Sequence, residues 1–100
     1  MALARASAVT SRIKLGTGIC LVPEHNPIAL AKEIATLDYF SKGRVMFGIG
    51  SGWLKEETEL YGIRFQDRGA VMRESILAMK ELWTKDQSEF HGKFVDFPAI

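Results

Sequence analysis

The sequence predicts an α/β fold with parallel strands, and three observations carry that prediction. Two nearly apolar segments, IKLGTGICLV at residues 13–22 and RVMFGIG at residues 44–50, are typical of strands buried on both faces. A helical pattern lies between them, and a strand-to-strand distance of about 30 residues suits one βαβ unit. A second helical pattern follows over residues 67–83.

The composition excludes several functional classes. The chain has 100 residues, enough for one domain at most, with 13 basic and 12 acidic side chains and a net charge of +1. No block of like charge indicates a nucleic-acid or membrane surface, and no apolar run approaches the roughly 18 residues that span a bilayer. Cys20 is the single cysteine and the two histidines stand apart, so neither an internal disulfide nor a metal site is expected. A reduced, cytoplasmic location follows as the expectation.

The helix between the two strands has a recognisable beginning and end. Asn26 is suited to cap it, and Pro27 to occupy its first position, where the missing N–H is no loss. Apolar residues recur at helical spacing from Ile28 to Leu37, and Gly43 is a plausible left-handed stop. Before the first strand, the opening MALARASAV is interpreted as the last turns of an Ala-rich helix that ends at Thr10, not as a signal segment.

A longer helix is expected from about Asp67 to Trp83. Met72, Ile76, Met79 and Trp83 recur at a spacing that places them on one face, and we interpret this stripe as core.

The segments on either side of this helix are shorter. The polar stretch after Trp53 predicts a short helix and a loop. The tail SEFHGKFVDFPAI predicts a small hairpin, with Phe90, Phe94 and Phe97 arranged around His91. Two parallel strands with these helices would leave both strand edges unpaired, so we expect a piece of a larger α/β protein.

Glycines gather at the ends of both predicted strands, in GTGI and in GIGSGW. A dinucleotide-binding loop needs glycines at the first, third and sixth positions, and here Trp53 stands at the sixth. In parallel α/β folds, ligands bind at the carboxyl ends of the strands. Bare backbone there would let a planar ring approach, and Thr17 and Ser51 would offer hydroxyls to its edge. The alternative is that the glycines serve only close packing, and the pattern leaves both interpretations open.

An ordered series of motifs gives this pattern a context. The segments TSRIKLGTGICLVPEHNPIALAKEIATLDYFSKGRVMFGIGSGW, EE, YGIRF, DRG, ELWT and FHGKFVDF together resemble the luciferase-like monooxygenase family, in particular its deazaflavin-dependent branch. The match runs from about Thr10 to Phe97 in the order that the family shows. The resemblance implies a (β/α)8 TIM barrel, which needs about 250 residues. Residues 1–100 would then be a fragment of one barrel domain, holding its third and fourth strands, their helices and the start of an insertion hairpin.

The resemblance also implies a cofactor across the mouth of the barrel, either the deazaflavin coenzyme (F-420) or reduced FMN. In several family members a non-proline cis peptide bond backs the ring, and here it would fall at Gly18–Ile19. Some deazaflavin-dependent dehydrogenases have an acidic residue where Trp53 stands, so an acid role there is not expected. The implied cofactor-binding residues are Thr17, Gly18, Ile19, Gly50, Ser51, Gly52 and Trp53.

For the other positions in these motifs, the expectations are mostly structural. His25 either contacts the cofactor tail or is an exposed loop residue, and His91 is expected to be solvated. Asp38 and Arg44 are expected to form an ion pair at the bottom of the barrel. Glu56 and Glu57 are expected to favour the N-terminus of the next helix through its dipole. Arg68 and Trp83 are expected to act in packing and capping.

The implied activity is that of an oxidoreductase acting on a small-molecule substrate. Reduced FMN would support oxygenation by O2 and a flavin reductase as partner, whereas the deazaflavin would support hydride transfer. A homo-oligomer, such as a dimer, is expected, and the segment reveals no catalytic acid or base. Two alternatives remain: a non-catalytic α/β piece or oligomerisation segment, and a nucleotide-binding α/β domain.

Overall fold

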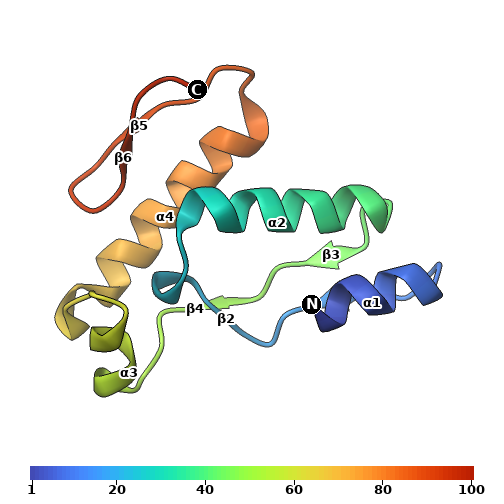
Figure 1. Cartoon of the computed structure of the whole chain (residues 1–100), viewed down its shortest axis with the longest axis horizontal. Helices are drawn as coiled ribbons and strands as arrows, with labels where there is room; N and C mark the ends of the chain where they lie inside the picture. The colour runs from blue at the N-terminus through green and yellow to red at the C-terminus, as the bar shows by residue number, and fades with distance from the viewer.

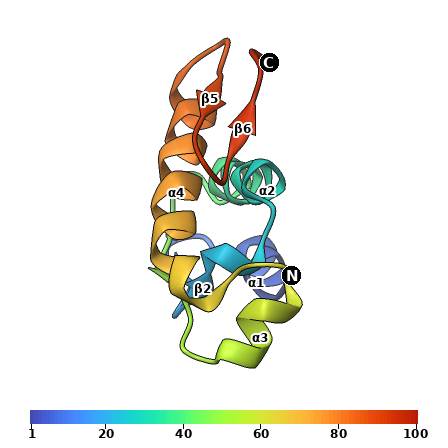
Figure 2. The ribbon, with the colours of Figure 1, turned by 90° about the vertical axis from the view of Figure 1, so that its left-hand side faces the viewer.

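The computed structural model describes residues 1–100, which form a flat α/β unit of 40 × 34 × 15 Å (Figure 1). In chain order the elements are α1 (Ala2–Val9), β1 (Leu15–Gly16), β2 (Cys20–Leu21), the 3-10 turn η1 (Val22–Glu24), α2 (Pro27–Phe40), β3 (Val45–Met46), β4 (Ile49–Gly50), α3 (Lys55–Leu60), the 3-10 turn η2 (Phe65–Asp67), α4 (Arg68–Thr84), β5 (Phe90–His91) and β6 (Asp96–Phe97). α2 packs against α4 and contacts β3, and a hairpin packs on α4, the last helix (Figure 2).

The βαβ arrangement is confirmed, but each predicted strand is divided into two. β1 pairs with β3 and β2 with β4, both in parallel, and α2 connects the two halves. Within residues 1–100 only one face of the strands is covered, so burial on both faces stays a prediction for the larger protein. Leu15, on the covered face, is 3% exposed, whereas Met46 is 62% exposed. The strand pairing breaks at Thr17, where the side-chain hydroxyl donates to the Gly48 carbonyl oxygen at 2.7 Å.

The predicted ends of α2 are confirmed. Asn26 Oδ1 accepts hydrogen bonds from the amides of Ile28 and Ala29 at 2.9 and 3.1 Å, and Pro27 is the first helical residue. At the other end Gly43 has φ +79°, and its amide donates to the Asp38 carbonyl oxygen at 2.8 Å. The chain therefore turns from α2 into β3 within four residues, numbers 41–44.

α4 buries two faces, and only one of them was predicted. Met79 is fully buried against Leu30 and Ala31 of α2, as the apolar stripe indicates. Trp83, the last residue of that stripe, is 38% exposed; its indole N–H donates to the Ala31 carbonyl oxygen at 2.9 Å. This hydrogen bond confirms the expected packing role of Trp83.

The second buried face of α4 lies under the hairpin. Ala78 is fully buried there and forms a cluster with Val95 and Phe97. Leu82 is half-buried and packs against this cluster and against the α2 cluster alike. The stripe prediction missed this face because its buried members include the small residues Ser75 and Ala78, which a search for large apolar residues passes over.

The expected ion pair between Asp38 and Arg44 is absent, and this prediction is wrong. Arg44 is 7% exposed, and its guanidinium instead donates five hydrogen bonds to uncharged oxygens. The planar guanidinium carries five donors, which suits a cage of carbonyl groups left open at a helix end. The acceptors, at 2.8–3.1 Å, are the carbonyl oxygens of Ser7, Thr10, Ile13 and Ser41 and the hydroxyl of Thr10.

The C-terminal hairpin is confirmed, with β5 and β6 antiparallel and Phe90 opposite Phe97. His91 is exposed as expected, yet its ring is held between two carboxylates. Its Nδ1 lies 2.6 Å from Asp96 Oδ1 and its Nε2 lies 3.2 Å from Glu89 Oε2. Hydrogen bonds with Glu89 and Asp96 raise the pKa of His91.

Glu74 of α4 holds the turn of the hairpin. Its Oε1 accepts hydrogen bonds from the amides of Phe94 and Val95 at 2.8 and 3.2 Å. The absence of a side chain at Gly92 makes room for this carboxylate, because a β-carbon there would collide with Glu74 Oε1. The backbone hydrogen bonds, first that from Phe94, lower the pKa of Glu74.

Replacing Glu74 with alanine is therefore expected to loosen the hairpin turn. Amide exchange at Phe94 and Val95 should accelerate about tenfold as both hydrogen bonds are lost. Because the folded-state pKa is depressed, the stabilisation is present above the unfolded pKa and is lost as pH falls through the folded pKa. Hydrogen exchange of the complete gene product, read on the peptide covering residues 90–97, measures both effects. Glu81→Ala is the control on the same helix, since that carboxylate contacts only Lys85; equal exchange in the two variants would contradict the assignment.

None of the helices combines the length and apolarity that crossing a membrane requires.

Candidate functional site

The predicted site residues meet at the carboxyl ends of the parallel strands. Cys20 pairs with Ile49 and Leu21 with Gly50, so the two glycine-containing segments run side by side. The Gly18–Ile19 peptide bond is cis, as the family resemblance implied. We call the seven residues of this surface the glycine wall: Thr17, Gly18, Ile19, Gly50, Ser51, Gly52 and Trp53.

The glycines of this region have different roles. A β-carbon on Gly18 would meet nothing within 4 Å, so its bare backbone faces open space. A β-carbon on Gly50 would lie 3.1 Å from Ile19 Cγ2, which shows how closely the two segments approach. Gly48, which the sequence analysis did not assign to the site, has the strictest requirement. A β-carbon there would collide with the Thr17 carbonyl oxygen.

The Thr17 side chain forms a hydrogen bond between the two strand segments. Its hydroxyl donates to the Gly48 carbonyl oxygen, which also accepts from the Cys20 amide at 2.9 Å. The hydroxyl can therefore offer a ligand only its acceptor capacity in this conformation. Ser51, the other hydroxyl of the glycine wall, is half-buried.

The end of β4 turns sharply at Gly52, which has φ +89°. Its carbonyl oxygen accepts from Arg68 Nε at 3.1 Å, and the guanidinium also stacks on Phe65, 3.8 Å from the ring centroid. This confirms the packing role expected of Arg68. The anchored turn presents Trp53 outward, with 81% of the residue exposed.

A pair of carboxyl groups beside this turn was missed by sequence reasoning. Glu24 follows β2, and its Oε2 would lie 3.7 Å from a β-carbon on Gly52. Burial raises the pKa of Glu24, and the neighbouring carboxyl of Glu57 raises it further. Glu57 stands in the first turn of α3, where a role with the helix dipole was expected. Glu24 lies three residues after β2 and Glu57 lies seven residues after β4, so no common spacing in the sequence pointed to this pair.

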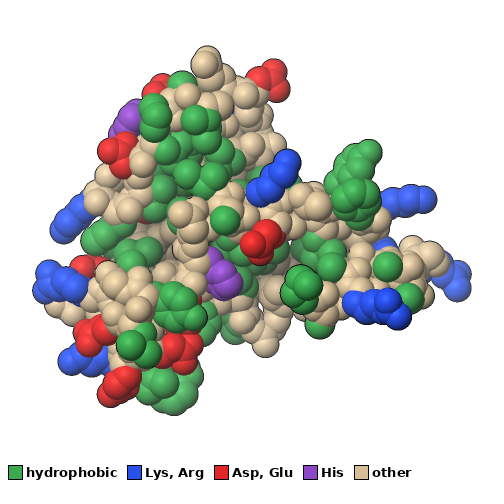
Figure 3. All heavy atoms as spheres, in the orientation of Figure 1, with side chains coloured by type: hydrophobic (Ala, Val, Ile, Leu, Met, Phe, Trp, Pro, Cys, Tyr) green, Lys and Arg blue, Asp and Glu red, His purple; other side chains and the backbone are tan.

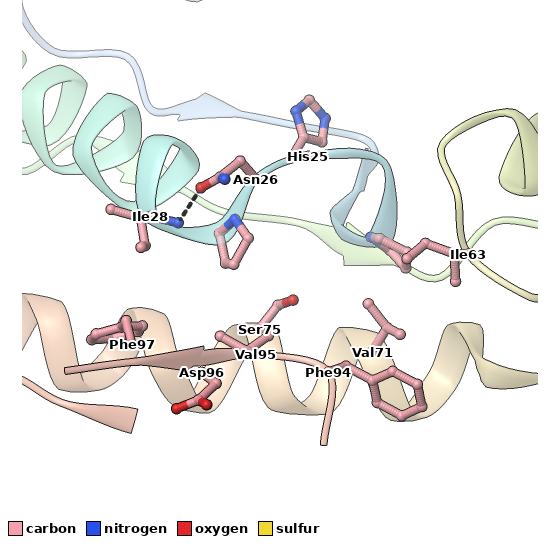
Figure 4. A pocket seen from close by; sticks show the side chains of 12 residues that line it. His25, Asn26, Ile28, Ile63, Val71, Ser75, Phe94, Val95, Asp96 and Phe97 are labelled. Carbon is pink, nitrogen blue, oxygen red and sulfur yellow. Dashed lines mark hydrogen bonds between the residues drawn. The ribbon is translucent and has the colours of Figure 1, made fainter. Parts of the chain in front are cut away.

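Two cavities lie outside the glycine wall. One of about 220 Å³ lies between the start of α2, α4 and the hairpin, with Ser75 and Val95 among its lining residues (Figure 4). The exposed His25 borders this cavity, and its ring points away from α4 (Figure 4). The other, of about 510 Å³, lies along α2 beside Phe47 and Trp83. Neither cavity is lined by a residue of the glycine wall.

The remaining reactive groups show no arrangement for independent chemistry. Cys20 is half-buried among the apolar residues around Met79, and this burial, with a smaller contribution from Glu33, raises the pKa of its thiol. A raised pKa disfavours the thiolate, which is the nucleophilic form. No group of three His, Cys, Asp or Glu side chains is placed to hold a metal ion.

Comparison with known proteins identifies relatives along the whole chain. The uncharacterized protein Rv0953c of Mycobacterium tuberculosis is 47% identical over 97 residues, covering 97% of this chain and 34% of that protein. The F420-dependent glucose-6-phosphate dehydrogenase of Amycolatopsis mediterranei is 39% identical over 92 residues, covering 87% of this chain and 27% of that protein. The chain thus spans 19–34% of the length of the curated relatives it matches.

A solved structure agrees with these relatives. The oxygenating constituent of 3,6-diketocamphane monooxygenase from Pseudomonas putida, a type II Baeyer-Villiger monooxygenase in complex with FMN, superposes with a TM-score of 0.86 at 30% identity. The match covers 95% of this chain and 27% of that one. One of these relatives is named as F420-dependent, and another is in complex with FMN. The family described as luciferase-like monooxygenase matches residues 1–100, and the chain belongs to that family.

Proposed function

We propose that this chain forms part of the mouth of a (β/α)8 barrel in a flavin- or deazaflavin-dependent oxidoreductase, and that the glycine wall backs the cofactor ring. In this proposal β1 and β2 belong to the third strand of the barrel, and β3 and β4 to the fourth. The observation that carries it is the parallel pairing of β2 with β4, which sets the open backbone of Gly18 beside the Gly50 segment.

The residues present fit a flat, largely apolar ring. Open space lies in front of Gly18, where a β-carbon would otherwise project. Ile19, 62% exposed, and Trp53, 81% exposed, add apolar surface to the glycine wall. When bound, reduced FMN would supply oxygen activation and the deazaflavin a hydride. The wall's part is to position the ring and to keep water from one of its faces.

A small-molecule substrate completes the proposal, with a flavin reductase as partner if the cofactor is FMN. We also propose a homodimer, supported by the exposed aromatic rings of Tyr39 and Phe40 at the end of α2. Analytical ultracentrifugation of the complete gene product measures that assembly.

The experiment that tests the function is a cofactor titration of the complete gene product. FMN and F-420, each oxidised and freshly reduced, are added separately while quenching of fluorescence is followed. We expect saturable binding of one of the two: FMN alone indicates an oxygenase, and the deazaflavin alone indicates hydride transfer. Failure of both to bind would overturn the proposal.

A pair of glycine variants locates the binding. Gly50→Ala adds a β-carbon in the glycine wall, 3.1 Å from Ile19, and should weaken cofactor binding. Gly69→Ala adds one in α4, where nothing lies within 4 Å, and should leave binding unchanged. Equal affinities of the two variants would count against the wall.

A further inference from the structure

The surroundings of the glycine wall are acidic. The segments that lead out of β2 and β4, residues 22–26 and 54–60, carry four carboxyl groups and one ammonium group. Acidic and hydrophobic side chains lie next to each other around α3 (Figure 3). We call this set the acidic rim: Glu24, Glu56, Glu57, Glu59 and Lys55.

Part of this acidity is placed directly behind the turn that carries Trp53. Glu24 Oε2 would lie 3.7 Å from a β-carbon on Gly52, and the Glu57 carboxyl is next to Glu24. A hydrogen bond joins the Glu24 and Glu57 carboxyl groups, so they share a proton, and an anionic group brought to the turn would be repelled by the negative charge that remains.

The nearest guanidinium does not offset this repulsion. Arg68 directs its Nε to the Gly52 carbonyl oxygen and its Nη1 to that of Phe65, at 3.1 and 3.0 Å. Its planar face is stacked on the Phe65 ring. Lys55 is exposed, but it adjoins Glu56 on the same helix.

Apolar side chains also face outward here. Trp53, Ile19 and Leu54 are 81%, 62% and 37% exposed. An indole presents a large rigid surface that gains most from contact with an apolar partner. Apolar contacts surrounded by carboxyl groups favour a neutral ligand over an anionic one.

We infer that the substrate seated against Trp53 is an uncharged, apolar molecule, and that Trp53 and the acidic rim together exclude anionic substrates from this part of the mouth. This inference rests on the proposed function, since it assigns a substrate class to the same site. Trp53 supplies the attractive contact, and Glu24 with Glu57 supplies the repulsive one. Specificity of this kind combines a favourable contact for one ligand with an unfavourable one for its competitor.

A matched pair of probes tests the inference on the complete, cofactor-loaded gene product. Methyl cyclohexanecarboxylate is neutral, and cyclohexanecarboxylate has the same ring with a negative charge. Calorimetric titration should show the ester binding at least about tenfold more tightly than the acid. Trp53→Phe should retain this preference, whereas Trp53→Glu should weaken ester binding about tenfold, since the aromatic contact is lost.

The repulsive part is tested separately. The double variant Glu24→Gln with Glu57→Gln should tighten binding of the acid and leave that of the ester unchanged. Leu60→Ala, which removes an 86% exposed apolar side chain of α3 outside the wall, should change neither. Circular dichroism verifies that each variant is folded.

The outcomes separate the two proposals. If neither cofactor binds the unmodified protein, the proposed function and this inference both fall. If a cofactor binds but the acid binds as tightly as the ester, or Trp53→Glu leaves ester binding unchanged, only the substrate inference is overturned. A preference for the ester, with ester binding weakened in Trp53→Glu and the preference reduced in the double glutamine variant, supports it.

Discussion

Replacing Arg44 with alanine should lower the free energy of unfolding by about 3 kcal/mol, because the acceptor oxygens around it, most of them partly buried, lose their donors. The guanidinium is 7% exposed and makes five hydrogen bonds. It joins the end of α1, the loop before β1 and the turn before β3. Urea denaturation of the complete gene product, followed by far-UV circular dichroism, measures the loss.

Two further variants make the result specific to the hydrogen-bond cage. Arg44→Lys keeps the charge but lacks the planar fork, so it should recover only part of the stability. Arg12→Ala removes an exposed arginine that lies between Thr10 and Ile13, two residues that Arg44 contacts, and should leave the urea midpoint within experimental error. An Arg44→Ala midpoint equal to that of Arg12→Ala would show that the cage does not stabilise the fold.

Replacing Gly48 with alanine should destabilise the protein by about 3 kcal/mol, at the upper end of typical overpacking effects. The added β-carbon would overlap the Thr17 carbonyl oxygen, which is backbone and cannot rotate away. Relief requires the two strands to separate, and this would disturb the hydrogen bonds that the Gly48 carbonyl oxygen accepts from Thr17 and Cys20. Cofactor binding at the neighbouring glycine wall should weaken as well.

Gly69→Ala provides the matched control for the stability effect. It stands in α4 with open space where the methyl group would go. Alanine reduces the entropy of the unfolded chain, so stability should stay equal or rise by up to about 1 kcal/mol. Equal urea midpoints for the Gly48 and Gly69 variants would contradict the close approach at Thr17.

Local signals in the sequence were enough to predict the helices and their ends. Asn26 followed by Pro27 fixes the beginning of α2, because a side-chain acceptor and a residue without an N–H both suit that position. Gly43 marks its end for an equally local reason, since the turn requires positive φ. The parallel pairing followed from the spacing of two apolar segments.

Contacts between distant residues were the ones that sequence reasoning missed or misassigned. Arg44 was expected to pair with the nearby Asp38, but its partners include Ser7 and Ile13, more than 30 residues away. Nothing in the sequence separated Gly48 from the other glycines, because its requirement comes from the close approach of the Thr17 carbonyl oxygen. The proximity of Glu24 and Glu57 follows from the pairing of β2 with β4, which the spacing of the two residues in the sequence does not reveal. A spacing rule describes one element at a time, whereas these contacts depend on how elements pack.

Leu82 couples the packing of the C-terminal hairpin to that of the α2–α4 pair. Its side chain belongs to the packing of both faces of α4, so the hairpin and the α2 layer share a residue that each needs. Two regions coupled through one packed side chain tend to open as a single cooperative unit. The free energy of opening the hairpin should therefore be close to that of opening the helix pair. Hydrogen exchange of the hairpin amides should then follow the global stability of the chain.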